Sequence, residues 1–345
     1  MMFHELNNDQ RREYINSQQR HDAWRKAKAD LEPLRGSMVW AGKPGAEYLV
    51  RSAYDKKTGL RRQKSLGPRS AETERMKAEF DHARRRLKSR VEDLEGLLER
   101  QASVNRALGL GRVPLLGAKI MRGLDMAGLL GRGIRIIGTN ALYAYEAAAG
   151  VFLEAGITTT EDIDLLFDAR QMHFASSYKP SERSLIAILR KVDRSFEKAQ
   201  EGFRAVNRDG YMVDFIKAVP APPWKTERET IDGQQGQADL MAAGVKGLGW
   251  LEESSPFHSL AVDQRGMPVS IVVADPRVFA AHKFWLSKRR DREPVKRRRD
   301  QEQAKAVAQL VTRYLTHLPY EHGQVSVLPR TVFEAARPLF EEDRA

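Results

Sequence analysis

Residues 161–167 read EDIDLLF, an apolar run that carries two aspartates one residue apart. Side chains alternate along a β-strand, so Asp162 and Asp164 share one face while Ile163 and Leu165 share the other. Two carboxylates about 7 Å apart on one face repel each other unless a cation or a basic group lies between them. A strand that only filled a core would not need this pair, which makes EDIDLLF the first candidate functional element.

A third carboxylate and a glycine turn extend the pattern. Asp214 lies inside the apolar stretch YMVDFI, which together with the preceding FRAVNRDG predicts a β-hairpin. Upstream, GIRIIGTNALYAYEAAAG (133–150) predicts a short buried strand, a turn at residues 138–140 and an Ala-rich helix. The backbone N–H groups and the Thr139 hydroxyl at such a helix start are groups that commonly hold phosphate.

The residue types favour a hard divalent cation over zinc. Three aspartates on neighbouring strands would supply oxygen ligands, which suit Mg²⁺ or Mn²⁺. The chain has no cysteine, and its eight histidines include no pair at metal-ligand spacing. An isolated Asp-x-Asp pair is common at strand ends and leaves a purely structural role open. The ordered set of glycine turn, paired acids and later acid favours a metal-dependent site.

This set resembles the nucleotidyltransferase superfamily that includes DNA polymerase beta. In that superfamily a Gly-Gly or Gly-Ser turn precedes Asp-x-Asp/Glu, and a third acid lies on a later strand. The match covers about residues 134–217. The resemblance implies that Asp162, Asp164 and Asp214 are the catalytic acids and bind two Mg²⁺ (or Mn²⁺) ions. It also implies transfer of NMP from an NTP to an acceptor hydroxyl.

The resemblance also suggests nucleotide-binding residues. It places Gly138 and Thr139 against the phosphates, and Thr139 keeps the hydroxyl of the family's serine. Asn140 would contact base or sugar, although an asparagine at a helix start is also a common cap. HKFWLSKRRDREPVKRRRDQEQA is similar to stand-alone bacterial nucleotidyltransferase-fold proteins, toxin-type members included. There Lys283 corresponds to a triphosphate-contacting lysine and Asp300 to an acid that anchors a helix.

The chain is long enough for three regions around an α+β core. Residues 1–102 predict a helix, a small β-sheet and a long basic helix. Residues 103–220 predict the mixed-sheet nucleotidyltransferase core. Residues 221–345 predict a substrate-binding or C-terminal region with a hairpin and helices.

Local signals refine this outline at three places. Ser70 is a good N-cap for the long basic helix, which we expect to run to about Gln101. Glycines punctuate residues 103–133, which predicts two short helices there. Residues 220–256 are rich in Gly, Pro and Gln and are expected to form an irregular connection.

The charge of the chain suggests a polyanionic partner. The net charge is +12, with 23 Lys and Arg against 16 Asp and Glu in residues 1–100 and 8 against 3 in residues 288–300. Basic segments 84–90 and 288–299 are therefore candidate contacts for RNA or tRNA. A solvated surface would show the same charge, and a small-molecule or protein acceptor remains open.

Several functional classes remain after these observations. No apolar run reaches the roughly 18 residues of a membrane span, and the start lacks the apolar core of a signal peptide. We therefore expect no membrane association and a cytoplasmic location. An active nucleotidyltransferase, a non-catalytic nucleic-acid-binding protein on the same fold and a toxin-type component of a toxin–antitoxin or defence system are the competing interpretations. The intact acids favour the enzyme, while nucleotide, acceptor and oligomeric state stay open.

Overall fold

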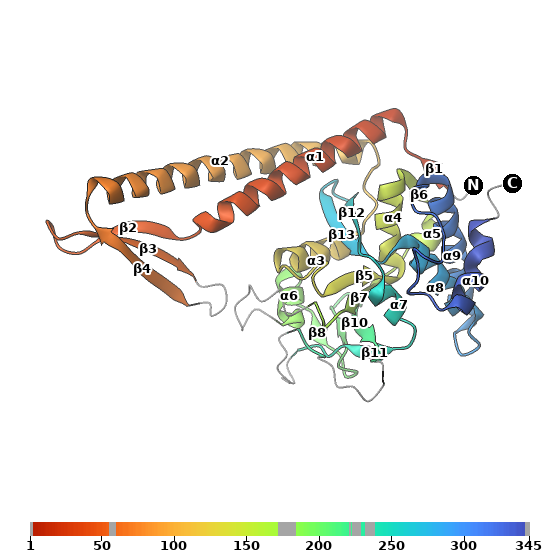
Figure 1. Cartoon of the computed structure of the whole chain (residues 1–345). Helices are drawn as coiled ribbons and strands as arrows, with labels where there is room; N and C mark the ends of the chain where they lie inside the picture. The colour runs from red at the N-terminus through yellow and green to blue at the C-terminus, as the bar shows by residue number, and fades with distance from the viewer. Residues whose placement is uncertain are drawn as a thin grey trace.

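The computed structural model describes residues 3–54, 60–171, 184–220, 222, 229–231 and 239–341. They form an elongated molecule in which a long arm projects from an α/β body (Figure 1). The arm is built from the N-terminal third of the chain, and the body contains the candidate acids.

The arm is an antiparallel helical hairpin with a small sheet at its far end (Figure 1). The helices are α1 (Asn8–Leu31) and α2 (Ala71–Ala107). Between them, β2 (Ser37–Ala41), β3 (Tyr48–Tyr54) and β4 (Arg61–Pro68) form an antiparallel sheet in the order β2-β3-β4. The expected helix, small sheet and long helix are therefore confirmed.

The long helix begins as predicted but ends later. Ser70 caps α2 and forms a capping box with Thr73. No glycine or proline interrupts the sequence between Gln101 and Ala107, so the helix continues past the expected end. The prediction of two short helices over residues 103–133 is wrong. The first residues of this range belong to α2, and one further helix, α3 (Leu115–Met126), follows. The expected domain boundary at residue 102 falls inside α2.

A buried polar cluster joins the root of the arm to the body. The Asn105 amide of α2 donates to Ser17 Oγ of α1 at 2.9 Å and to the carbonyl oxygen of Gly266 at 2.8 Å. Tyr14 of α1 donates its hydroxyl proton to the carbonyl of Leu260. Because buried polar groups are costly when unpaired, these contacts favour one position of the arm on the body.

The body contains a mixed sheet in the order β5-β7-β10-β9-β8. β7 and β10 are parallel, whereas β5 pairs with β7, β9 with β10 and β8 with β9 in antiparallel fashion; β11 adds a parallel pairing to the C-terminal half of β10. The strands are β5 (Ile134–Ile137), β7 (Asp162–Phe167), β8 (Glu197–Lys198), β9 (Arg204–Val206), β10 (Met212–Ala218) and β11 (Ala243–Val245). The predicted α+β fold with a mixed-sheet core is confirmed.

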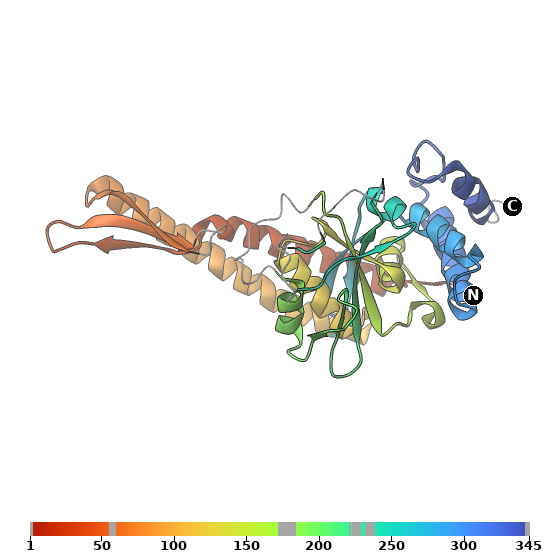
Figure 2. The same cartoon turned by 90° about the horizontal axis from the view of Figure 1, so that it is seen from below.

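Helices cover both faces of this sheet, as Figure 2 shows most clearly. α3 and α6 lie on one side, and α4, α8 and α9 lie on the other. The bounds are α4 (Leu142–Ala149), α5 (Ala155–Thr158), α6 (Leu185–Val192), α7 (Gly249–Glu253), α8 (Pro276–Lys288), α9 (Pro294–Tyr314) and α10 (Arg330–Ala336), with short 3₁₀ turns at Glu32–Leu34, Gly138–Ala141 and Arg337–Phe340.

Two further strand pairs complete the body. The predicted hairpin is present as β12 (Phe257–Val262) and β13 (Pro268–Val273). β1 (Phe3–Glu5) pairs with β6 (Val151–Leu153), which links the start of the chain to the body. The connection expected to be irregular holds β11 and α7 among its described residues. No helix in the described ranges is long and apolar enough to cross a bilayer.

Candidate active site

The structure brings the three predicted acids to neighbouring strands. Along β7, Ile163 and Leu165 are fully buried, whereas Asp162 and Asp164 on the other face are partly exposed. β10 lies beside β7 in a parallel register that sets Asp214 directly opposite Asp164. Adjacent strands are about 4.8 Å apart, so directly opposed side chains lie on the same face of the sheet. The expected position of Asp214 on the strand beside Asp164 is confirmed.

The glycine turn lies directly against this acidic face. Ile137, the last residue of β5, is paired with Asp164, and Gly138 follows with a φ of 65°. A methyl group on Gly138 would overlap the Oδ2 atom of Asp164. Glycine is therefore required twice at this position, once for its left-handed backbone and once for the space that the carboxylate fills.

The acidic face carries uncompensated negative charge. Desolvation, together with the charges of Asp162 and Asp214, raises the pKa of Asp164 to about 6 against the opposing effect of Lys283 and Arg292. A carboxyl with a pKa this high is one that lacks a sufficient counter-charge. A bound cation would remove this deficit.

Asp214 is the acid that has a full partner. Arg204 lies opposite it on β9 and donates two hydrogen bonds, from Nε to Oδ1 at 2.6 Å and from Nη2 to Oδ2 at 2.8 Å. Such a two-pronged pair is among the strongest side-chain contacts in proteins. Both oxygens of the third acid are thus engaged by an arginine.

The remaining residues of the turn face inward. Thr139 is 9% exposed, and its hydroxyl accepts a hydrogen bond from Gln303 Nε2 of α9 at 3.2 Å. Asn140 is 1% exposed and donates its amide proton to the carbonyl oxygen of Asp162 at 2.7 Å. The asparagine thus fastens the turn to the start of β7. That it also contacts a nucleotide stays a prediction.

A second charged cluster stands beside the acids. Lys283 of α8 and Arg292 of the α8–α9 loop donate to the two oxygens of Asp300, at 2.8 Å and 2.6 Å. Burial acts to raise the pKa of Asp300, but the two cations hold it below the ordinary value. The predicted anchoring role of Asp300 therefore has a geometric basis: it aligns two cations that also act electrostatically on Asp164.

The family of the chain follows from a comparison of its sequence with known families. A family model described as Nucleotidyltransferase matches residues 116–328, which is more than half of the chain. The chain belongs to the nucleotidyltransferase family. Its family makes this nucleotidyltransferase a transferase enzyme. The match spans the body from α3 to just before α10 and leaves out the arm. No curated protein and no solved structure matches the chain.

The donor set of this nucleotidyltransferase fits a hard cation in its chemistry. Carboxylate oxygens on two adjacent strands are the ligands that Mg²⁺ and Mn²⁺ prefer, and a cation there would offset the burial and the neighbouring acids that raise the pKa of Asp164. Among the described residues, however, no group of three or more His, Asp or Glu side chains already converges on one point. The engagement of Asp214 by Arg204 is consistent with that result.

Two residues of the site are absent from the sequence-based predictions. The hairpin turn at NRDG implies a register in which Arg204 faces Asp214, so this arginine could have been found. Arg292 is one of eight basic residues between 288 and 300. Only the structure separates it from its neighbours, by its bond to Asp300.

Proposed function

We propose that this enzyme transfers an NMP from an NTP to an acceptor hydroxyl with the help of two Mg²⁺ or Mn²⁺ ions. The observation that carries the proposal is that Asp162, Asp164 and Asp214 lie on one face of two neighbouring strands, with Gly138 packed against Asp164. The same arrangement supports membership of the superfamily that includes DNA polymerase beta.

The three acids would have distinct tasks in this reaction. Asp162 and Asp164 would hold the ions, and Asp214 would join them once it is free of Arg204. When bound, the ions would neutralise the phosphates and lower the pKa of the acceptor hydroxyl. Asp214, the acid on the neighbouring strand, would also accept the hydroxyl proton.

The phosphate-binding groups would come from two sides. Backbone N–H groups of Gly138 and Thr139 lie at the turn beside Asp164. Lys283 and Arg292 supply positive charge from α8 and the loop after it, and Asp300 fixes both of them. This pair of aligned cations is the natural counter-charge for a triphosphate, with Arg292 the more accessible of the two.

We propose RNA, with tRNA as one form of it, as the acceptor. Within residues 288–299 the side chains of Arg289, Arg292, Lys296 and Arg298 are paired with acids, so much of that charge is already neutralised. Segment 84–90 on α2 keeps more free charge, since its arginines are exposed on the arm.

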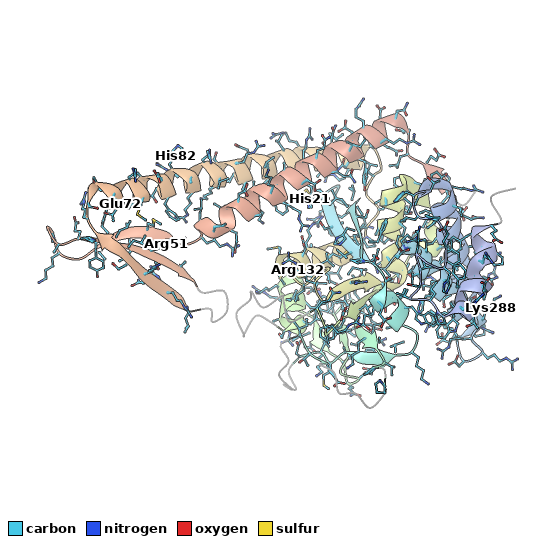
Figure 3. The ribbon with its side chains drawn as sticks, viewed as in Figure 1. His21, Arg51, Glu72, His82, Arg132 and Lys288 are labelled. Atoms are coloured by element: carbon cyan, nitrogen blue, oxygen red, sulfur yellow. The ribbon has the colours of Figure 1, made fainter. Side chains whose placement is uncertain are left out.

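The two basic segments also lie far apart, one partway along the arm and the other on the body. Figure 3 places His82, next to segment 84–90, on the arm and Lys288 on the far side of the body. α2 has 37 residues, and a helix of that length is about 55 Å long. Only an extended polyanion could contact both segments, which favours a macromolecular acceptor. Cytoplasmic location and a toxin-type role stay predictions.

Labelled nucleotides test this function directly. The full-length protein is incubated with each α-³²P NTP, Mg²⁺ or Mn²⁺, total RNA and total protein, and the labelled product is identified. We expect label in RNA from one or a few NTPs, and its loss in Asp214→Asn. Asp209→Asn is the matched control, because Asp209 is an exposed acid in the turn of the same hairpin. Label in protein would change the acceptor, and no transfer with any NTP and either metal would refute the function.

A further inference from the structure

Arg204 binds Asp214, which is one of the three acids that the proposed function needs. Its guanidinium uses Nε and Nη2 on the two oxygens of Asp214. The Asp214 side chain is 17% exposed and that of Arg204 is 30% exposed. The pair is therefore sufficiently buried for its hydrogen bonds to be strong, and Arg204 is sufficiently exposed to move into solvent.

The positive charge of Arg204 acts on more than Asp214. Hydrogen bonding to Asp214 is the main cause that raises the pKa of Arg204, and the charges of Asp214, Glu201 and Asp162 raise it further. Because Arg204 and Asp214 are directly opposed across β9 and β10, the guanidinium lies on the face that carries the acids. It is thus a monovalent cation at the edge of a site suited to divalent ones.

The Arg204 guanidinium is held less firmly than the cations on the other side of the site. Within the described part of the chain its hydrogen bonds go to Asp214, with the Phe203 ring nearby at 5.6 Å. Arg292, in contrast, is bound to Asp300, which is itself buried and paired a second time with Lys283. Arg204 can leave without unpairing any other residue than Asp214.

We propose that Arg204 is a positioning residue that competes with a divalent cation for Asp214. In the metal-free enzyme, Asp162 and Asp164 are then available to a first ion, and Asp214 becomes a ligand when a second ion displaces the guanidinium. The two ions bind in order, and the second binds more weakly because it must displace an arginine. This inference rests on the proposed function.

Mn²⁺ binding to the full-length protein without nucleotide tests the competition. Electron paramagnetic resonance of free Mn²⁺ gives the number of bound ions and their dissociation constants. We expect one tighter and one weaker ion in the wild type. Arg204→Gln should tighten the weaker ion by about tenfold or more, since a charge-assisted pair no longer opposes it. Arg204→Lys keeps a charge but loses the two-pronged geometry and should fall between the two.

Arg208→Gln is the matched control for charge. Arg208 lies in the turn of the same hairpin, and its side chain is 79% exposed. Its removal lowers the net charge by the same amount and should leave Mn²⁺ binding as in the wild type. Asp214→Asn should abolish the weaker ion both alone and together with Arg204→Gln, because the ligand itself is then lost.

The outcomes separate this inference from the function on which it rests. Unchanged or weaker Mn²⁺ binding in Arg204→Gln, with NMP transfer intact in the wild type, would overturn the competition and leave the function standing. Absence of both transfer and Mn²⁺ binding in the wild type would overturn both. Circular dichroism checks folding, and if Arg204→Gln does not fold, tighter binding in Arg204→Lys supports the inference and unchanged binding overturns it.

Discussion

Two charged clusters of the body lie side by side and have opposite electrostatics. In one, Asp300 is paired with Lys283 and Arg292, and its carboxyl pKa is held below the ordinary value. In the other, Asp164 lies against the turn at Gly138 with two more acids near it, Lys283 and Arg292 offset its charge only in part, and its pKa rises to about 6. The carboxylate of Asp300 is neutralised by cations of the chain, whereas the charge of Asp164 is offset only in part.

The largest expected effect comes from breaking the neutralised cluster. Asp300→Asn removes the partner of Lys283 and Arg292 and leaves a buried lysine, 8% exposed, without its carboxylate. Loss of one member of a buried ion pair costs about 3–5 kcal/mol. Urea unfolding at pH 8 should show this loss. Arg298→Gln is the control. It breaks the exposed pair of Arg298 with Glu302 on the same helix and should cost below about 1 kcal/mol.

Crowding of the other cluster gives the next largest effect. Gly138→Ala forces a methyl group against Asp164 and should destabilise the enzyme by about 2–4 kcal/mol. It should also lower NMP transfer more than its stability loss explains.

Gly150→Ala controls for the backbone part of that change. Gly150 has a φ of 66°, close to the 65° of Gly138, but a methyl group there would meet no atom within 4 Å. The control should cost about 1–2 kcal/mol and leave transfer intact. Equal effects of the two changes on thermal unfolding and on transfer would show that the contact with Asp164 is unimportant.

A pH titration of stability examines the surroundings of the neutralised cluster. His282, next to Lys283, is buried between Trp250 and Trp285, and burial lowers its pKa to about 3, with Lys283 adding to the effect. Between about pH 6.5 and pH 3, His282 is therefore protonated in the unfolded chain and neutral in the folded chain. The free energy of unfolding falls as the pH falls through this window. Between pH 8 and pH 5 the loss should be about 2 kcal/mol.

His282→Phe isolates this contribution. Its free energy of unfolding should change about 2 kcal/mol less than that of the wild type between pH 8 and pH 5. His258→Phe, on β12, is a control histidine with an exposed side chain. Parallel pH profiles for wild type and His282→Phe would contradict the assignment.

The smallest expected effect has the opposite sign. Asp164→Asn removes a charge that the metal-free protein does not compensate, so it should stabilise the protein by about 1 kcal/mol at pH 8 in EDTA. The same change should abolish NMP transfer. Thermal unfolding of Asp164→Asn beside Asp300→Asn gives the comparison in one experiment, because the first should melt higher than wild type and the second lower.

The sequence predicted those parts of the molecule that depend on local patterns. Alternation along EDIDLLF placed Asp162 and Asp164 on the partly exposed face of β7, and the Ser70 cap located the start of α2. The end of α2 was missed because its last turn is stabilised by tertiary contacts of Asn105 with the body. The pairing of β1 with β6 was also missed, since three-residue strands carry too little pattern to be recognised.

The sequence predicted the acids of the candidate site but not the arginines that pair with acids there. Asp214 could be placed beside Asp164 because both lie in apolar strands of a recognisable order. Which arginine meets which acid depends on the path of the chain between strands and helices. Arg204 could have been inferred from the register of its hairpin, whereas Arg292 has no feature that separates it from its basic neighbours, and its importance comes from its distance to Asp300.

The arm has a mechanical consequence that follows from its length. A helix of 37 residues acts as a lever about 55 Å long, so a rotation of about 5° at its root moves its tip by about 5 Å. The fulcrum is formed by the contacts between arm and body, which include those of Asn105 with Gly266, of Tyr14 with Leu260 and of Arg25 with Asp125. Substitutions at this fulcrum would therefore move the small sheet at the tip of the arm, and anything bound to it, without changing a residue of the active site.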